Sequence, residues 1–198
     1  MNDFNISTLS EEDISQVVNI HIESFNGFFL TTLGYSFLHC YYSSVIRNED
    51  SICVGIFDKN KLIGFAVGTI KPVGFHKKLF LKNFKLFLPY LFKYIFKPKV
   101  ILRLLLNLQK GSKREINNYA ELLSIAVNKN FMGKGWGKIL LKEFERQVLK
   151  NNFKNIILTT DYYNNEYTMN FYKNNGYSVF DIFITYPKRK MYKMIKRF

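Results

Sequence analysis

One stretch decides the fold: ELLSIAVNKNFMGKGWGKILL, residues 121–141. The apolar run Tyr119–Val127 is typical of a buried strand, and the amphipathic pattern over Gly135–Asn151 predicts a helix. The turn between them is rich in glycine, which lets a backbone fold tightly and expose its N–H groups. The first turn of a helix adds unpaired N–H donors and a partial positive charge. The segment therefore predicts a binding site for an anion such as a pyrophosphate, with Lys134 and Lys138 beside it.

Two other phosphate-binding patterns are disfavoured in this stretch. The Rossmann pattern needs a further glycine three places after Gly137, where this chain has Leu140, and it follows the first strand of its unit. The Walker pattern needs serine or threonine after Gly137-Lys138, where this chain has Ile139. Alternating glycines alone are a weak signal, so a connector that binds nothing stays open as the alternative.

Patterns elsewhere in the chain predict a strand, two helices, a hairpin, an insertion, a strand–helix–strand unit, a helix and two closing strands. The other strands are expected at Phe4–Thr8, Ser51–Phe57, Leu62–Ile70, Ile156–Thr160, Tyr177–Tyr186 and Met191–Phe198. Helices are expected after the capping box Ser10–Asp13, over Phe28–Ile46 and over Asn165–Asn174. This order predicts one domain over residues 1–198, built on a mixed α/β sheet.

Residues 73–112 form an unusual insertion between the hairpin and the decisive stretch. It contains three apolar helical patterns studded with lysine, and prolines separate them: Leu79–Leu88, Tyr90–Phe96 and Lys99–Leu108, with Pro89 and Pro98. From Lys71 to Arg114 the chain has twelve Lys and Arg residues and no Asp or Glu, which supplies most of the net charge of +14. The partner of this segment is therefore expected to be anionic: a phosphate-bearing substrate, a membrane surface or nucleic acid.

Composition narrows the class of protein. The chain is 47% hydrophobic and 22% charged, which is typical of a globular protein. No stretch reaches the ~18–20 uninterrupted apolar residues of a spanning helix, and the first residues lack the features of a secretory signal. Cys40 and Cys53 have no metal-like spacing and are expected to be buried free thiols in a reducing compartment. We therefore expect a cytoplasmic protein that binds no metal.

A second motif follows about thirty residues later: NEYTMNFYKNNGY, residues 165–177. Taken singly, its residues have structural explanations, since Asn165 suits a helix N-cap, Gly176 a helix end and Tyr172 an apolar core. The joint pattern is more specific, because an apolar–Tyr pair and a Gly–aromatic pair follow Asn165 at fixed spacing.

Together the two motifs resemble motifs A and B of the GNAT superfamily of N-acetyltransferases. The resemblance covers nearly the whole chain outside residues 73–112. Two departures from the family pattern stand out. Met132 occupies a position where the family carries Gln or Arg, and Thr168 replaces the more usual alanine.

The resemblance implies a mostly antiparallel central sheet splayed between two parallel strands and flanked by helices. It also implies acetyl-CoA as the co-substrate, without a metal, and an arm of CoA that pairs with the strand at the splay. The positions that match the cofactor-binding motifs are Ile125, Ala126, Val127, Gly133, Lys134, Gly135, Trp136, Gly137, Lys138, Asn165 and Phe171.

The same resemblance implies roles for two catalytic side chains. Tyr172 is the candidate general acid for the departing thiolate, and Glu121 the candidate base that takes the amine proton through a water. A carboxylate paired with a lysine is the alternative for Glu121. A backbone N–H near Ile125–Val127 would stabilise the oxyanion, and the end of the next strand, Thr159–Asp161, would line the acceptor pocket.

The acceptor is less defined than the cofactor. A basic insertion favours a primary amine on an anionic small molecule, such as a nucleotide-linked or lipid-linked amino sugar, and a position at the inner face of the membrane fits the lipid-linked case. A protein or peptide N-acetyltransferase is the alternative. A non-catalytic module that binds membrane or nucleic acid is the alternative of another class, although no nucleic-acid motif accompanies the lysines, so nucleic acid is disfavoured. The sequence leaves a homodimer open.

Overall fold

A mixed sheet of seven strands forms the centre of the computed structural model, which describes residues 4–92 and 118–198. The strand order is β1-β2-β3-β4-β5-β7-β6, and every neighbouring pair is antiparallel except β4 and β5. The strands are β1 (Phe4–Thr8), β2 (Ser51–Asp58), β3 (Lys61–Thr69), β4 (Tyr119–Val127), β5 (Asn155–Asp161), β6 (Ser178–Thr185) and β7 (Arg189–Arg197). The predicted fold class and strand positions are confirmed.

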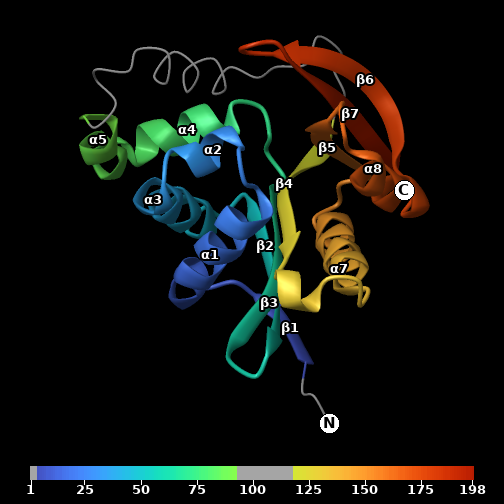
Figure 1. The fold of residues 1–198 in the computed structure, drawn as a ribbon, viewed down its shortest axis with the longest axis horizontal. Helices are drawn as coiled ribbons and strands as arrows, with labels where there is room; N and C mark the ends of the chain where they lie inside the picture. The colour runs from blue at the N-terminus through green and yellow to red at the C-terminus, as the bar shows by residue number, and fades with distance from the viewer. Residues whose placement is uncertain (1–3, 93–117) are drawn as a thin grey trace.

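Helices cover both faces of the sheet (Figure 1). One layer holds α1 (Ile14–Ser24), α2 (Phe29–Thr32), α3 (Tyr35–Ile46), α4 (Phe75–Lys82) and α5 (Phe84–Phe92), and the other holds α7 (Trp136–Lys150) and α8 (Glu166–Asn174). Short 3-10 turns, Glu11–Asp13 and Lys129–Phe131, precede α1 and α7. None of the helices in the two described ranges is long and apolar enough to cross a membrane.

Three helix predictions differ from the structure. The helix expected over Phe28–Ile46 is divided at Gly34, whose φ of 85° is a left-handed conformation that interrupts a right-handed helix. The helix expected over Leu79–Leu88 is divided at Asn83, whose side-chain amide donates to the Leu79 carbonyl at 2.9 Å and caps α4. Pro89 lies inside α5 instead of at a helix boundary.

The remaining predictions for the insertion, including the helix over Lys99–Leu108 and Pro98, lie outside the described residues. Of the predicted helix Tyr90–Phe96, the first three residues form the end of α5.

Each face of the sheet carries its own apolar core. The core under α1, α3, α4 and α5 includes Leu38, Tyr42, Phe65 and Phe87. The core under α7 and α8 is built on the opposite face and includes Leu140, Phe144, Ile156, Tyr172 and Met194. The central strands β2 and β3 are buried on both faces, which explains their continuous apolar sequence.

The parallel pair β4–β5 is short. It runs only from Tyr119 opposite Asn155 to Leu122 opposite Leu158, so the second half of β4 has no strand partner on that side within residues 4–92 and 118–198. The register of β4 against β3 also shifts at this point, since Leu122 lies opposite Gly68 and Ser124 lies opposite Val67. The extra residue between them is a β-bulge, which bends β4 away from β5 and opens the sheet.

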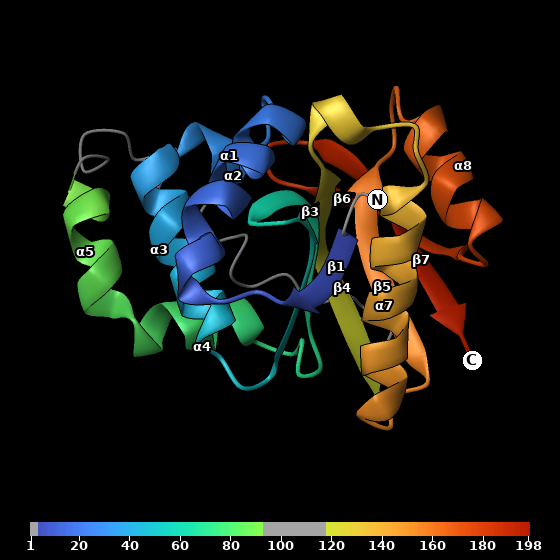
Figure 2. The same ribbon diagram turned by 90° about the horizontal axis from the view of Figure 1, so that it is seen from below.

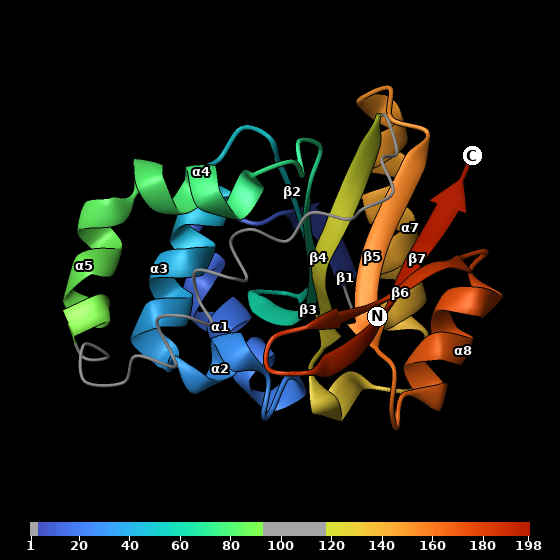
Figure 3. The ribbon, with the colours of Figure 1, turned by 90° about the horizontal axis from the view of Figure 1, so that it is seen from above.

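The β6–β7 hairpin extends from the far edge of the sheet back over the open region. Figures 2 and 3 show its tip near the α1–α2 side of the molecule. The guanidinium of Arg189 at the start of β7 lies 4.3 Å from the centre of the Phe28 ring, before α2. The hairpin and the N-terminal helices therefore meet across the splay.

One buried pair of polar side chains joins α1 to α3. The Nδ1 atom of His21 lies 2.7 Å from the Tyr42 hydroxyl, and both residues are almost fully buried. Burial lowers the pKa of His21 to about 4, so the imidazole is neutral at physiological pH. Burial also raises the pKa of Tyr42, so the phenol stays protonated.

The close approach of β3 to β4 at the bulge gives a first prediction. A Cβ atom on Gly68 would lie 2.4 Å from the Glu121 carbonyl oxygen and 2.4 Å from Cζ of Phe144. We expect Gly68→Ala to lower the free energy of unfolding by about 1–3 kcal/mol, measured by urea denaturation. Gly137→Ala is the control, because its Cβ would meet Phe171 at an ordinary 3.6 Å and alanine favours a helix. Equal losses in both variants would contradict this account.

The buried imidazole gives a second prediction. Between pH 6.5 and about 4 the unfolded chain binds a proton at His21 that the folded chain does not bind. The free energy of unfolding is therefore unaffected by His21 protonation above pH 6.5. As the pH drops from 6.5 towards 4 it falls, by roughly 3 kcal/mol at most. We expect His21→Phe to flatten the dependence of the unfolding free energy on pH in this window. His39→Phe, at a partly exposed position, should keep the wild-type slope, and a wild-type slope in His21→Phe would refute the assignment.

Candidate active site

A cavity of about 1740 Å³ occupies the opening between β4 and β5. Its walls come from both helical layers, from the turn before α7 and from the β6–β7 hairpin. Of the thirteen predicted site residues, twelve line it: Glu121, Ile125, Ala126, Val127, Gly133, Gly135, Trp136, Gly137, Lys138, Asn165, Phe171 and Tyr172. Lys134 does not line it, and its ammonium lies instead 5.5 Å from the centre of the Phe131 ring.

The turn before α7 presents backbone amides to this cavity. Gly133 and Gly135 have φ values of 76° and 84°, a conformation that disfavours any residue with a Cβ. None of the amides of residues 133–137 donates a hydrogen bond to a described residue, and the first bonds of α7 run from Lys138 and Ile139 to the Gly135 carbonyl. These donors and the positive end of the helix can hold a diphosphate. Met132 lines the same wall and is 58% exposed.

Trp136 supports the turn from the other side. Its ring centre lies 4.3 Å from that of Phe4 on β1, so the first residue of α7 is fixed against the edge of the sheet. The turn is therefore held by packing on one side while its amides face the cavity on the other.

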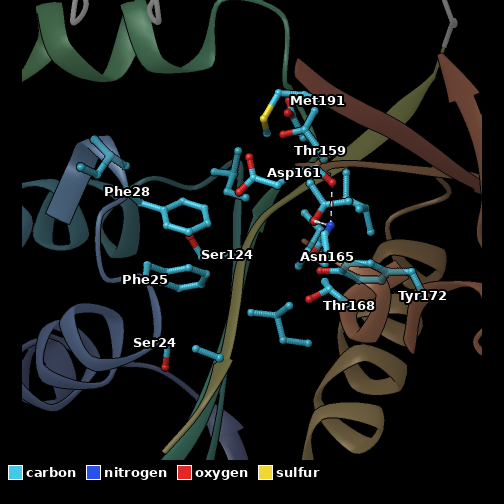
Figure 4. Close-up of a pocket in the computed structure, with 18 of the residues that line it drawn as sticks. Ser24, Phe25, Phe28, Ser124, Thr159, Asp161, Asn165, Thr168, Tyr172 and Met191 are labelled. Atoms are coloured by element: carbon cyan, nitrogen blue, oxygen red, sulfur yellow. Dashed lines mark hydrogen bonds between the residues drawn. The ribbon is translucent and has the colours of Figure 1, made fainter. Parts of the chain in front are cut away.

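Tyr172 lies on α8 across the cavity from β4 (Figure 4). It is 7% exposed, and its ring packs against Phe171 and Tyr177 at 5.2 and 5.7 Å between centres. Its hydroxyl makes no hydrogen bond to a described residue. Burial raises the pKa of this phenol above its ordinary value, so it is protonated and can donate to an anion that forms in the cavity.

Asn165 fixes α8 relative to β5. It stands at the N-cap position without capping the helix through its side chain. Instead its amide donates to Thr160 Oγ1 at 2.8 Å and to the Asp161 carbonyl at 2.7 Å (Figure 4). The side chain therefore ties the start of α8 to the end of β5. This contact helps to position Tyr172, which lies about two turns further along the same helix.

Glu121 enters the cavity from the paired half of β4. Its carboxylate interacts electrostatically with Tyr41 on α3, with Tyr119 and with Lys193 on β7. Lys193 is almost fully buried, and its burial lowers the pKa of the ammonium. The carboxylate thus lies on the α3 side of the sheet, whereas Tyr172 belongs to the core on the α8 side, and the cavity joins the two.

The end of β5 carries an ion pair that the sequence did not reveal. Arg189 binds Asp161 through two hydrogen bonds, Nε to Oδ1 at 2.5 Å and Nη2 to Oδ2, and both side chains line the cavity. Arg189 also stacks on Phe28. Asp161 is at its expected place, but its partner comes from the closing hairpin, where sequence spacing gives no sign of the contact.

Ser124 is a second residue that the sequence did not mark. It follows the bulge, lines the cavity and faces the α1 side, near Phe25 and Phe28 (Figure 4). Ser124 interacts with the Tyr42 phenol and lowers its pKa against the larger effect of burial, and Tyr42 in turn contacts His21. A bulge shifts the alternation of side chains along a strand, and this places a hydroxyl where regular alternation predicts a different face.

The described part of the insertion turns an apolar face to the cavity. Its lining residues are Gly74, Phe75, His76, Leu79, Phe80 and Phe87, and Pro72 lines the cavity just before the insertion. The lysines of α4 and α5, Lys77, Lys78, Lys82 and Lys85, are exposed and do not line the cavity. The exposed lysines of these two helices therefore do not contribute to the cavity wall.

The described residues hold no cluster of three or more His, Cys, Asp or Glu side chains that could bind a metal ion. Cys53 is buried and Cys40 is partly buried, and both are free thiols.

Comparison with known proteins agrees with this geometry. Among solved structures, the PaiA N-acetyltransferase of Thermoplasma acidophilum in complex with coenzyme A is 20% identical, with a TM-score of 0.58 and coverage of 99% of each chain. The ribosomal-protein-S18-alanine N-acetyltransferase of Escherichia coli is 16% identical, with a TM-score of 0.60 and coverage of 98% of this chain and 93% of that one. A spermidine N-acetyltransferase chimera of Vibrio cholerae and human sequence is 14% identical, with a TM-score of 0.63 and coverage of 98% and 95%.

At these identities the likeness shows the fold alone. A comparison with curated protein sequences finds no match. The family model described as the acetyltransferase (GNAT) family matches residues 14–177, which include both motifs, the splay and the cavity walls other than the β6–β7 hairpin. The chain therefore belongs to the acetyltransferase (GNAT) family, which makes it an acyltransferase.

Proposed function

We propose that the protein transfers an acetyl group directly from acetyl-CoA to a primary amine held in the cavity between β4 and β5. The observation that carries this proposal is the meeting of two features in one cavity. Unpaired amides of residues 133–137 form one wall, and the buried phenol of Tyr172 stands on another. The amides supply hydrogen-bond donors for the diphosphate of the cofactor, and the phenol supplies one for its sulfur.

The cofactor would enter along the unpaired edge of β4. Beyond Leu122 this edge pairs with no described strand, so its N–H and C=O groups are available to the amide-bearing arm of CoA. The diphosphate would bind the amides before α7, with Lys138 beside it. A backbone N–H near Ile125–Val127 would then donate to the oxyanion that forms at the thioester carbon.

In the reaction the amine nitrogen attacks the thioester carbon, the C–N bond forms, and the C–S bond breaks. Tyr172 donates to the departing thiolate. Because burial raises the pKa of this phenol further above that of a thiol, a hydrogen bond to the thiolate is favoured over a complete proton transfer. Glu121 takes the amine proton through a water, and its carboxylate faces the same cavity.

For the acceptor we propose an amine carried on an amphiphilic, phosphate-bearing molecule, such as a lipid-linked amino sugar. The aromatic wall of α4 and α5 supports an apolar portion of the acceptor, and the overall charge of +14 supports an anionic one. A nucleotide-linked amino sugar has the anionic portion of such an acceptor but lacks the apolar portion. A peptide N-terminus is the alternative, and rates of thiol release with the three classes of amine distinguish them.

The glycine turn gives a prediction for cofactor binding. Gly135 has a left-handed backbone that alanine disfavours, so Gly135→Ala should change the conformation of the turn. The amides would then no longer point at the diphosphate. We expect CoA affinity in calorimetry to fall about tenfold or more. Gly27→Ala is the matched control, because Gly27 has a φ of 78° and open space around it but does not line the cavity. It should lose similar stability and keep the wild-type affinity. Wild-type CoA affinity in Gly135→Ala would exclude the turn from the binding site.

The phenol gives a prediction for the chemical step. Tyr172→Phe keeps the ring and removes the donor, so turnover should fall roughly ten- to a thousandfold with CoA binding unchanged. Turnover is measured as thiol release. The substrate is the amine that reacts fastest among the lipid-linked, nucleotide-linked and peptide amines named above. Tyr177→Phe is the control, because this neighbouring buried tyrosine does not line the cavity. Unchanged turnover in Tyr172→Phe would remove this residue from the mechanism.

A further inference from the structure

Large apolar side chains are exposed on the outer side of α4 and α5. Leu81 is 62% exposed and Phe92 61%, and three other residues on α5 are between 36% and 43% exposed: Phe84, Leu86 and Leu88. We call these five residues the apolar ridge. Several exposed apolar groups on two neighbouring helices indicate an interaction surface, whereas single ones are ordinary.

The geometry of α5 explains why the ridge is separate from the core. Phe87 is 1% exposed, and it packs on Phe37 and Phe80 at 5.3 and 5.0 Å between ring centres. Phe84, Leu88 and Phe92 follow one another at intervals of four residues and form a stripe on a different side. A helix that is apolar on its outer side as well as its inner side needs a second apolar partner.

The charge around the ridge indicates the kind of partner. Lys77, Lys78, Lys82 and Lys85 are exposed on the same two helices and form no ion pair with a described carboxylate. No Asp or Glu occurs anywhere between Lys71 and Arg114 in the sequence. The surface therefore combines apolar side chains with positive charge alone.

We propose that this surface of α4 and α5 binds an anionic lipid membrane, with the ridge inserted among the headgroups and the lysines facing lipid phosphates. Helices that lie on membranes combine an apolar side with lysine in this way. A second copy of the chain is disfavoured as the occupant, because two such surfaces would bring four lysines of each into repulsion without a carboxylate between them.

The position of the surface connects it with the cavity. Figures 1 and 3 place α4 and α5 at the outer edge of the N-terminal helical layer, on the side away from α7. The inner sides of the same helices supply Phe75, Leu79 and Phe80 to the cavity wall. Only the thickness of α4 and α5 would therefore separate a bound membrane from the acceptor in the cavity. The proposal stands on the surface alone and does not depend on catalysis.

Co-sedimentation with lipid vesicles tests the proposal on the full chain. We expect binding to vesicles of equal parts phosphatidylglycerol and phosphatidylcholine, little binding to phosphatidylcholine alone, and loss of binding as salt rises from 0.1 to 0.5 M. The double variant Phe84→Ser/Phe92→Ser should bind at least tenfold more weakly. Lys78→Gln/Lys82→Gln should bind at least fivefold more weakly.

Two control variants carry the same changes elsewhere. Tyr163→Ser/Ile184→Ser removes side chains that are 67% and 71% exposed near the closing hairpin, and Lys142→Gln/Lys150→Gln removes exposed charge on α7. Both should bind like the wild type. No binding to anionic vesicles, equal binding to both vesicle types, or equal losses in test and control variants would overturn the proposal. So would self-association in sedimentation velocity that the ridge variant abolishes.

Discussion

The end of pairing between β4 and β5 at Leu122 and Leu158 is the constraint on which the rest of the structure depends. A sheet that continued to pair would bury the second half of β4 and leave no cavity. The bulge at the β3–β4 register shift bends β4 without removing it from the sheet, because its other edge stays bonded to β3. The protein thus keeps a continuous sheet for stability and still leaves a strand edge with free backbone groups inside the molecule.

The two walls of the opening have different physical tasks. On the α7 side, the wall is mainly backbone: Gly133 and Gly135 are left-handed, the amides of residues 133–137 donate to no described residue, and Trp136 packs on Phe4. On the N-terminal side, the wall is made of side chains, which include aromatic rings and Ser124. Asn165 and the Asp161–Arg189 pair join the walls at the end of β5, so the distance between them is set by hydrogen bonds as well as by packing.

The parts of the site that are local in sequence could be predicted from it. The strand, turn and helix from Tyr119 to Lys150 form one continuous unit, and glycine spacing with helical periodicity indicates both its shape and its chemistry. The contacts that could not be predicted are long-range. Arg189 reaches Asp161 only because β7 pairs with β5, and Ser124 faces Tyr42 only because a bulge shifts the side-chain alternation. Glycine at position 34 marks a helix break that periodicity alone hides, since apolar residues recur on both sides of it.

The lysines in the described part of the basic insertion lie on the outer surface and not at the cavity. A surplus of lysine next to an active site suggests an electrostatic funnel for an anionic substrate, but the lysines of α4 and α5 point away from the cavity. Inside it, the cationic Arg189 is neutralised by Asp161, and Lys193 interacts with Glu121. The described wall of the cavity therefore combines aromatic side chains with paired charges. The positive charge of α4 and α5 lies on the outer surface, where the proposed membrane contact would use it to orient the whole molecule.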